Sequence, residues 1–406
     1  MLCKYCLDCK CSPVRVLCLR CTITPVTSEF ESTSDNQALK EVIVARIERE
    51  GGISFHDFMA MALYQPRLGY YCSPGEKMGR LGDYLTSPEI SPVFGAMVGR
   101  QLREMWEAME RPARFKVVEV GAGNGTLCRD VLRWARRSAP ELLTTIEYGI
   151  VEISQAMVVR QRDSLVTEGL DEHVTWHERL PDEIEGCILT NELLDAMPVH
   201  VVVAEGAAVR EVFVTWDRQS FGENLRAPST AGVERHFENL GLRPGEQCRA
   251  EVNLQSLNWM RDAAAALRRG FVLTFDYGYE ATELYAPWRK DGTLLCFYRH
   301  NPSNDPYARI GRQDMTSHVD FTSLRQTGEQ AGLETIGLVT QSAFLTDVGI
   351  AAALMQGDED LEGHYTRRRA VTELLDPAGL GRIRVLAQSN GMGSVKLSGM
   401  NQQHDA

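Results

Sequence analysis

An acid and three glycines at alternate positions lie between Val117 and Leu127: Glu119, Gly121, Gly123 and Gly125. Glycine lets the backbone pass close to a ligand and adopt angles that a side chain would forbid. Dinucleotide-binding loops have the spacing G-x-G-x-x-G, and their third glycine packs near a pyrophosphate. Here the spacing is G-x-G-x-G, and Thr126 stands where that third glycine would be. An acid ahead of this spacing is typical of S-adenosylmethionine (SAM) loops; the alternative is a glycine-rich turn that binds no ligand.

Glu152 ends the next apolar stretch, over residues 147–152. Ligands of open α/β sheets bind beyond the carboxyl ends of the strands, where an acid can accept hydrogen bonds from ribose hydroxyls. We therefore predict that Glu152 binds a ribose. The alternative is a solvent-exposed acid at the end of a strand.

Asn191 and Glu192 follow the apolar stretch 187–190, and Tyr277 follows the stretch 271–276. A carboxylate near a methyl-transfer centre can hold a guanidinium or take a proton from it. We assign Asn191, Glu192 and Tyr277 to the acceptor side of the site. The alternatives are a helix cap with a first-turn acid for Asn191 and Glu192, and an ordinary turn around Tyr277. Residues 193–198 are expected to form one turn that ends at Pro198.

Strand-like and helix-like segments alternate along most of the chain, which predicts an α/β fold with a parallel, doubly wound sheet. The expected strands cover 116–120, 147–152, 173–177, 187–190 and 271–276, and a final strand is expected at 394–397. Residues 199–250 interrupt the alternation with a β-hairpin and are interpreted as an insertion. The predicted organisation is a leader at 1–35, a helical extension at 36–110 and a main domain at 111–400.

The composition excludes several classes of function. The formal net charge is −12, whereas nucleic-acid binding needs a basic face, so we expect no nucleic-acid partner. No apolar run is long enough to span a bilayer, so no membrane insertion is expected. The serine-hydrolase elbow, the phosphate-binding P-loop and the H-E-x-x-H spacing of metalloproteases are absent from the sequence, and we expect no metal at the site.

Six of the eleven cysteines lie in the first 21 residues and include C-x-x-C pairs. A small zinc knuckle is one interpretation. An unstructured leader, a segment upstream of the true start and a transit peptide are the alternatives. The other cysteines are dispersed among apolar residues, which is typical of buried, reduced thiols.

Several further motifs make the chain resemble the MidA family of SAM-dependent methyltransferases, which includes a mitochondrial complex I assembly factor. Beside the glycine loop, the motifs lie at 58–66 (FMAMALYQP), 69–71 (GYY), 82–91 (GDYLTSPEIS), 190–200 (TNELLDAMPVH), 276–279 (DYGY) and 316–321 (TSHVDF). The likeness covers residues 40–400. Residues 307–312 and Met315 depart from the family pattern, so substrate contacts there can differ.

The resemblance implies a Rossmann-like SAM-dependent methyltransferase sheet with an inserted β-hairpin subdomain and a helical N-terminal extension. It also implies that SAM is the methyl donor and that Thr86, Ser87, Pro88 and Glu89 form a lid or wall of the pocket. The family's known activity is symmetric dimethylation of an arginine in a respiratory complex I subunit.

We therefore expect a SAM-dependent methyltransferase that acts on a protein arginine, with a complex I subunit as partner. The alternatives are a non-catalytic SAM-binding assembly factor and a small-molecule methyltransferase. The expected location is the bacterial cytoplasm, or the mitochondrial matrix if the source is eukaryotic. The oligomeric state stays open, a homodimer included.

Overall fold

The fold was analysed in a computed structural model, which describes residues 35–401 except 74, 76, 78, 80, 81, 207 and 355–360. The cysteine-rich head lies outside these residues, and so do the predictions made for it. The five cysteines that are described are free thiols, and four of them are buried. No helix in the described part of the chain is long and apolar enough to cross a bilayer.

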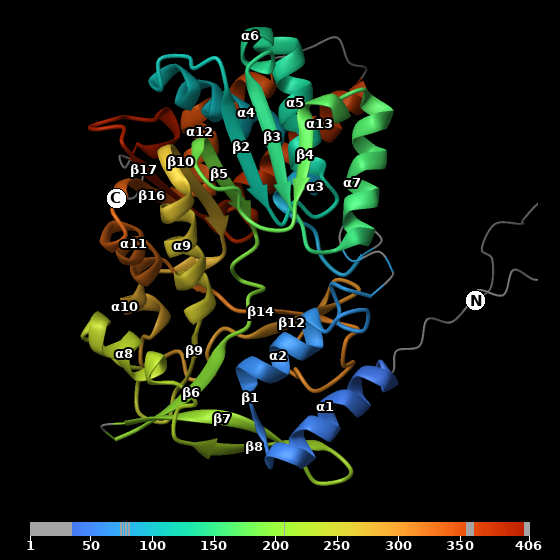
Figure 1. The fold of residues 1–406 in the computed structure, drawn as a ribbon, viewed down its shortest axis with the longest axis vertical. Coiled ribbons are helices and arrows are strands. Elements are labelled where there is room, and N and C mark those ends of the chain that lie inside the picture. Colours follow the sequence, from blue (N-terminus) through green and yellow to red (C-terminus); the bar gives the residue numbers. More distant parts are fainter. Residues whose placement is uncertain are drawn as a thin grey trace, which may run out of the picture. The chain divides into compact units, whose positions relative to one another are not determined.

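The main lobe is a seven-stranded sheet between two layers of helices (Figure 1). Its strand order is β16 (Glu334–Thr340), β17 (Arg384–Asn390), β10 (Leu267–Asp276), β5 (Ile184–Asn191), β2 (Phe115–Val120), β3 (Ile146–Val151) and β4 (Val174–His177). The five strands from β10 to β4 are parallel, which confirms the predicted fold class. β17 runs antiparallel to both of its neighbours, β10 and β16. These antiparallel pairings were not predicted from the sequence.

Two apolar cores hold the helices on this sheet. One contains the buried faces of α4 (Pro92–Ala108), α5 (Thr126–Ser138) and α12 (Gln341–Val348). The other contains α9 (Leu254–Ala266) and α11 (Phe321–Gln330). Burial of both faces explains why the parallel strands are almost continuously apolar in sequence.

The expected strand at 394–397 does not exist. The last strand is β17, where Val385, Leu386 and Ala387 are buried between two neighbouring strands. Leu397 is also buried, but it packs against the helical side of the sheet from irregular chain. The short run at 394–397 was thus wrongly predicted as a strand, because its apolar residues pack on the core without pairing with another strand.

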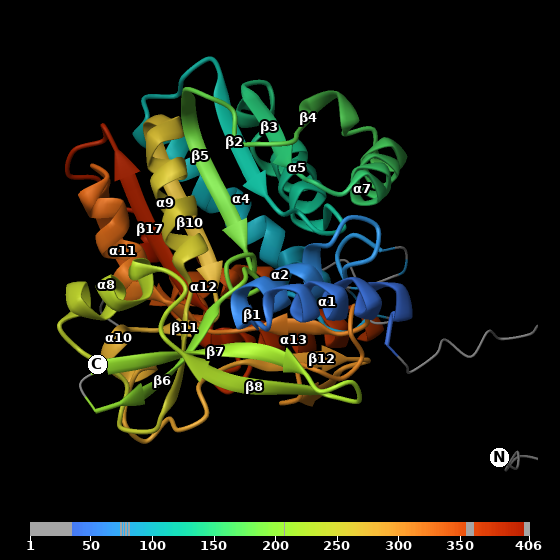
Figure 2. The same cartoon turned by 60° about the horizontal axis from the view of Figure 1, so that its bottom comes forward.

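A second lobe combines segments that are far apart in sequence (Figure 2). Its main sheet has the order β1 (Ile53–Ser54), β7 (Ala208–Trp216), β6 (His200–Glu205) and β9 (Arg249–Val252), and β8 (Phe221–Arg226) also pairs with β7. The predicted hairpin is β6–β7. Because β1 pairs with β7, the N-terminal extension and the insertion share one sheet.

Helices cover both faces of this second sheet. The apolar core under α1 (Gln37–Glu50) and α2 (Phe55–Tyr64) lies on one face, and that under α8 (Ala231–Leu240) and α10 (Ala281–Leu284) lies on the other. A small sheet of β13 (Asn301–Ser303), β12 (Leu295–Tyr298) and β14 (Asp314–Thr316) adjoins α2, and β11 (Gly278–Tyr279) pairs with β15 (Val319–Asp320). The helix α2 thereby lies between the second sheet and the small one.

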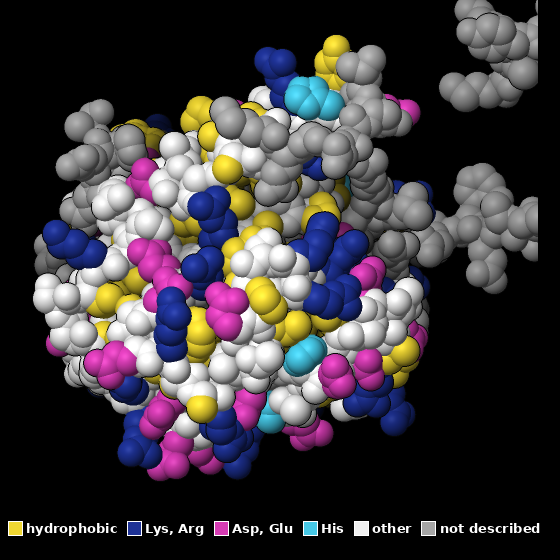
Figure 3. Space-filling model, turned by 90° about the horizontal axis from the view of Figure 1, so that it is seen from above, with side chains coloured by type: hydrophobic (Ala, Val, Ile, Leu, Met, Phe, Trp, Pro, Cys, Tyr) yellow, Lys and Arg dark blue, Asp and Glu magenta, His cyan; other side chains and the backbone are white. Residues whose placement is uncertain are grey.

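The molecular surface carries charges of both signs. On the face shown in Figure 3, Lys and Arg side chains lie interspersed with Asp and Glu side chains. Some of these charges on the molecule are paired, such as Arg249 with Glu223 at 2.7 Å and Arg114 with Glu147. Exposed pairs of this kind contribute about 0–1 kcal/mol each to the free energy of unfolding. The apolar cores of the two lobes therefore carry most of the stability.

Two neighbouring glycines allow β5 to pack between β2 and β10. Gly186 lies opposite Lys116 on one side and Gly270 on the other. A Cβ atom at Gly186 would come within 1.9 Å of the Lys116 carbonyl oxygen. Its φ of 148° is also rare for residues with a side chain.

We predict that Gly186→Ala lowers the free energy of unfolding by about 3 kcal/mol or more, because strain and overpacking add at this position. Urea unfolding followed by circular dichroism measures the change. Gly241→Ala is the matched control, since Gly241 has φ 63° but no atom within 4 Å of an added Cβ. It should cost about 1–2 kcal/mol. Equal losses in the two variants would contradict the close-approach argument.

Candidate functional site

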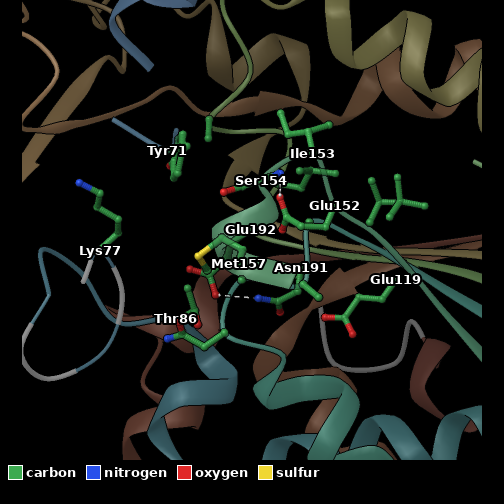
Figure 4. Close-up of a pocket in the computed structure, with 18 of the residues that line it drawn as sticks. Tyr71, Lys77, Thr86, Glu119, Glu152, Ile153, Ser154, Met157, Asn191 and Glu192 are labelled. Carbon is green, nitrogen blue, oxygen red and sulfur yellow. Dashed lines mark hydrogen bonds between the residues drawn. The ribbon is translucent and has the colours of Figure 1, made fainter. Parts of the chain in front are cut away.

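A cavity of about 480 Å³ lies beyond the carboxyl ends of β2, β3 and β5 (Figure 4). Nine of the predicted site residues line it: Thr86, Pro88, Glu89, Glu119, Gly121, Gly123, Glu152, Asn191 and Glu192. Ser87 and Gly125 are adjacent in sequence to lining residues but do not line it themselves. Parallel strands place their carboxyl ends at one edge, which is why residues so far apart in sequence meet here.

The glycine loop connects β2 to α5 with a left-handed backbone at all three glycines. Their φ angles are 70°, 52° and 75° for Gly121, Gly123 and Gly125. A Cβ at Gly121 would lie 2.7 Å from the Leu193 side chain, so this glycine also lets the chain after β5 pack on the loop. Gly125 serves as the N-cap of α5.

Glu152 is fixed beside the glycine loop by two hydrogen bonds. Its carboxylate accepts from the Ser154 amide at 2.8 Å and from Gln161 Nε2 at 3.3 Å. The same Gln161 nitrogen donates to the Gly123 carbonyl at 2.8 Å, and Trp176 Nε1 donates to Gln161 Oε1 at 3.0 Å. Burial raises the pKa of Glu152, and the amide of Ser154 opposes that rise. Gln161, from α7 (Gln155–Glu168), therefore couples the predicted ribose acid to the loop.

Glu119 is buried at the base of the loop, where the Tyr148 hydroxyl donates to its carboxylate at 2.7 Å. Burial raises the pKa of Glu119 to about 7, against the effect of this hydrogen bond. The side chain points into the cavity from the end opposite to Lys77 in the view of Figure 4.

The segment Thr86–Glu89 closes one side of the cavity by contacts with both neighbouring loops. The Ser87 amide donates to Glu192 Oε1 at 3.0 Å. Glu89 Oε1 accepts from Thr126 Oγ1 at 2.7 Å and from Asn124 Nδ2 at 3.3 Å. The segment is thus a fixed wall between the glycine loop and the end of β5.

Glu192 has a left-handed backbone with φ 50°, which is uncommon for a residue with a side chain. Its amide donates to the Phe275 carbonyl at 2.9 Å, and Asn191 Nδ2 donates to its carboxylate at 3.1 Å. Burial raises the pKa of Glu192 to about 8, and the Ser87 amide opposes the rise. Asn191 Oδ1 is buried without a hydrogen-bond partner among the described residues, so it is an acceptor that a ligand can use.

The expected turn at 193–198 forms, with the Met197 amide donating to the Leu194 carbonyl at 3.2 Å, but it does not continue into a helix. Asp276 Oδ2 accepts from the amides of Leu193 and Leu194, at 3.2 Å and 2.8 Å, and fixes an irregular loop instead. Asp276 is completely buried, and desolvation raises its pKa to about 8. Asp276 thereby satisfies two buried or half-buried backbone amides of this loop.

Tyr277 does not line the cavity. Its ring stacks with that of His318 at 6.3 Å, and the Arg382 guanidinium lies 5.7 Å from its centre. Three other tyrosines do line the cavity, namely Tyr64, Tyr71 and Tyr84. These tyrosines lie within the family motifs at 58–66, 69–71 and 82–91, but no role was predicted for them from the sequence. Gln161 was not predicted as a site residue either, because it is an isolated polar residue in a helix and belongs to no motif.

The described residues contain no group of three or more His, Cys, Asp or Glu side chains arranged to hold a metal ion. The polar groups of the cavity are carboxylates, the Lys77 ammonium, three side-chain amides, hydroxyls, the Cys72 thiol and the backbone of the glycine loop.

Comparison with known proteins agrees with this geometry. Residues 97–339 match a family model described as "putative S-adenosyl-L-methionine-dependent methyltransferase". "Protein arginine methyltransferase NDUFAF7, mitochondrial" from Mus musculus is 32% identical over 77% of this chain and 74% of its own. Its Drosophila melanogaster homolog is 28% identical over 89% and 87%.

A crystal structure from Burkholderia thailandensis shares the fold over nearly its whole length. It superimposes with a TM-score of 0.84 at 31% identity and covers 91% of this chain and 97% of its own. That protein is bound to S-adenosyl-homocysteine. The fold with its second lobe is therefore shared with a protein that binds the product form of SAM.

We predict that Gly123→Val lowers the affinity for SAM at least a hundredfold, because a β-branched side chain is strongly disfavoured at φ 52° and the loop must move. Isothermal titration measures the affinity. Gly241→Val is the control, since it makes the same change at a similar φ outside the cavity. Wild-type affinity in a folded Gly123→Val protein would contradict the assignment of the loop.

Proposed function

The chain belongs to this family of SAM-dependent methyltransferases, and we propose that its acceptor is a protein arginine, which it converts to symmetric dimethylarginine. The half-buried carboxylate of Glu192, which lines the cavity, is the observation on which the proposal rests. It lines the same cavity as the glycine loop, and the Ser87 amide and Asn191 fix its position. The names of the relatives support an arginine acceptor, at identities of 25–32%.

SAM is the methyl donor, and the residues of the cavity fit it. Glu152 can accept hydrogen bonds from ribose hydroxyls, because a carboxylate has more acceptor sites than Ser154 and Gln161 use. Asn191 Oδ1 offers a further buried acceptor. When bound, SAM supplies a methyl group whose bond to the sulfonium breaks, with the electron pair staying on sulfur, as the acceptor nitrogen forms its new bond.

Glu192 holds the acceptor guanidinium and takes its proton. A guanidinium is protonated at any ordinary pH, so its nitrogen needs a base to become a nucleophile. The carboxylate is partly shielded from solvent, so a cation brought beside it is held more strongly than at the open surface. Thr86–Glu89 and the glycine loop keep the two reactants in one enclosed space, so positioning supplies much of the rate.

We further propose a subunit of respiratory complex I as the protein partner, in the mitochondrial matrix or the bacterial cytoplasm. Residues of both lobes line the cavity, which is partly open to solvent. A homodimer is compatible with this proposal.

Incubation with labelled SAM and candidate complex I subunits, followed by peptide mapping and acid hydrolysis, tests the proposal. Label in symmetric dimethylarginine at one site, absent with Glu192→Gln, is the expected result. Label on a small molecule alone would favour the small-molecule alternative. SAM binding without any transfer would favour the non-catalytic one.

The rate is expected to depend on pH through Glu192. Below a pKa of about 8 the carboxyl is protonated and cannot accept a proton, so kcat/KM should rise about tenfold per pH unit and level off above pH 8. Steady-state kinetics between about pH 6 and 9.5 measure the profile. Glu192→Gln should reduce kcat by about 10²–10⁴-fold and remove this inflection while leaving SAM affinity unchanged. The same inflection in the variant would assign it to another group.

A further inference from the structure

Three tyrosines form one wall of the cavity, and all of them come from the N-terminal extension. Tyr64 is the last residue of α2, and Tyr71 and Tyr84 lie in the following loop. We call Tyr64, Tyr71 and Tyr84 the tyrosine wall. In the view of Figure 4, Tyr71 lies on the side of Glu192 that is remote from Glu119. The wall therefore borders the part of the cavity beyond Glu192.

Hydrogen bonds fix two rings of the wall, those of Tyr64 and Tyr71, and use their donors. The Tyr64 hydroxyl donates to the Ala196 carbonyl at 3.0 Å, and the Tyr71 hydroxyl donates to Asp314 Oδ1 at 2.6 Å. The two rings stack at 5.4 Å with an angle of 26° between their planes. A phenol that already donates can still accept, so these oxygens offer acceptor capacity.

The ionisable side chains around the wall are mostly acidic. Four glutamates and one lysine are the charged side chains among the described residues that line the cavity: Glu89, Glu119, Glu152, Glu192 and Lys77. Asp314 is buried directly behind Tyr71. Burial, and after it the charge of Asp314, raises the pKa of each phenol of the wall above its ordinary value, so the tyrosines stay neutral.

We propose that the tyrosine wall is the acceptor subsite and that it selects a guanidinium over an ammonium or a neutral side chain. This proposal rests on the arginine acceptor proposed above. A guanidinium carries five N–H donors and no acceptor, which complements phenol oxygens that have already used their hydrogens. Its plane also stacks on aromatic rings, whereas an ammonium is a compact and strongly hydrated point charge. Tyr64 and Tyr71 bind the acceptor, and Glu192 takes its proton.

Binding of a small probe tests the subsite without requiring turnover. N-acetyl-arginine methylamide is titrated against the full chain in the presence of S-adenosyl-homocysteine and followed by ligand-observed NMR. The lysine and citrulline analogues are titrated in parallel, since citrulline keeps the shape of arginine but lacks its charge. We expect the arginine probe to bind at least tenfold more tightly than either analogue.

Two substitutions of one tyrosine separate the ring from its oxygen. Tyr64→Leu should weaken the arginine probe by about ten- to thirtyfold, and Tyr64→Phe by a few-fold, because Phe keeps the ring face. Affinity for S-adenosyl-homocysteine should stay within about twofold. Tyr365→Leu is the matched control, since Tyr365 is an exposed tyrosine that does not line the cavity. If Tyr64→Leu lowers the melting temperature strongly, Tyr64→Phe alone carries the comparison.

Equal binding of the three probes, no binding at millimolar concentration, or full affinity in Tyr64→Leu would overturn the subsite. Tyrosine-dependent binding of the arginine probe supports it even if no protein arginine is methylated. In that case the proposed reaction fails while the subsite stands. The opposite result, arginine methylation that is indifferent to Tyr64, leaves the reaction and removes the subsite.

Discussion

The left-handed backbone at Glu192 is the constraint on which the site depends. A residue with a side chain adopts φ 50° only where its surroundings enforce it, at a cost of order 1–3 kcal/mol. Here two consecutive residues of β10 hold this backbone in place. The Phe275 carbonyl accepts a hydrogen bond from the Glu192 amide, and the Asp276 carboxylate accepts hydrogen bonds from the next two amides. The turn directs the Glu192 carboxylate to the Ser87 amide and packs Leu193 against Gly121. One strained residue thereby aligns the base, the wall segment and the glycine loop.

The second lobe matters because it completes the cavity. The parallel sheet supplies the loop, Glu119, Glu152 and Glu192, all on one side. The opposite side comes from α2 and the loop after it, which are held by the sheet that β1 shares with the inserted hairpin. The extension therefore contributes to the site although it precedes the methyltransferase sheet in sequence. A main lobe alone would leave the cavity open beyond Glu192.

The sequence predicted what local pattern and strand geometry determine. The parallel strands are apolar runs between turns, and the residues that end them must meet at one edge of the sheet, so Glu152, Asn191 and Glu192 could be grouped in advance. The tyrosine wall could not be assigned that way. Tyr64 contacts Ala196 across 132 positions and Tyr71 contacts Asp314 across 243, and no periodicity encodes such pairs. The hydrogen bond from the Leu194 amide to Asp276 was not predicted for the same reason, because the two residues lie 82 positions apart.

The electrostatics of the cavity follow from burying several carboxylates together. Each carboxylate loses hydration, and the pKa values of Glu119, Glu152 and Glu192 rise because few cations lie nearby to compensate. A cationic ligand supplies the missing charge, so its binding must favour the ionised form of Glu192 and release protons by linkage.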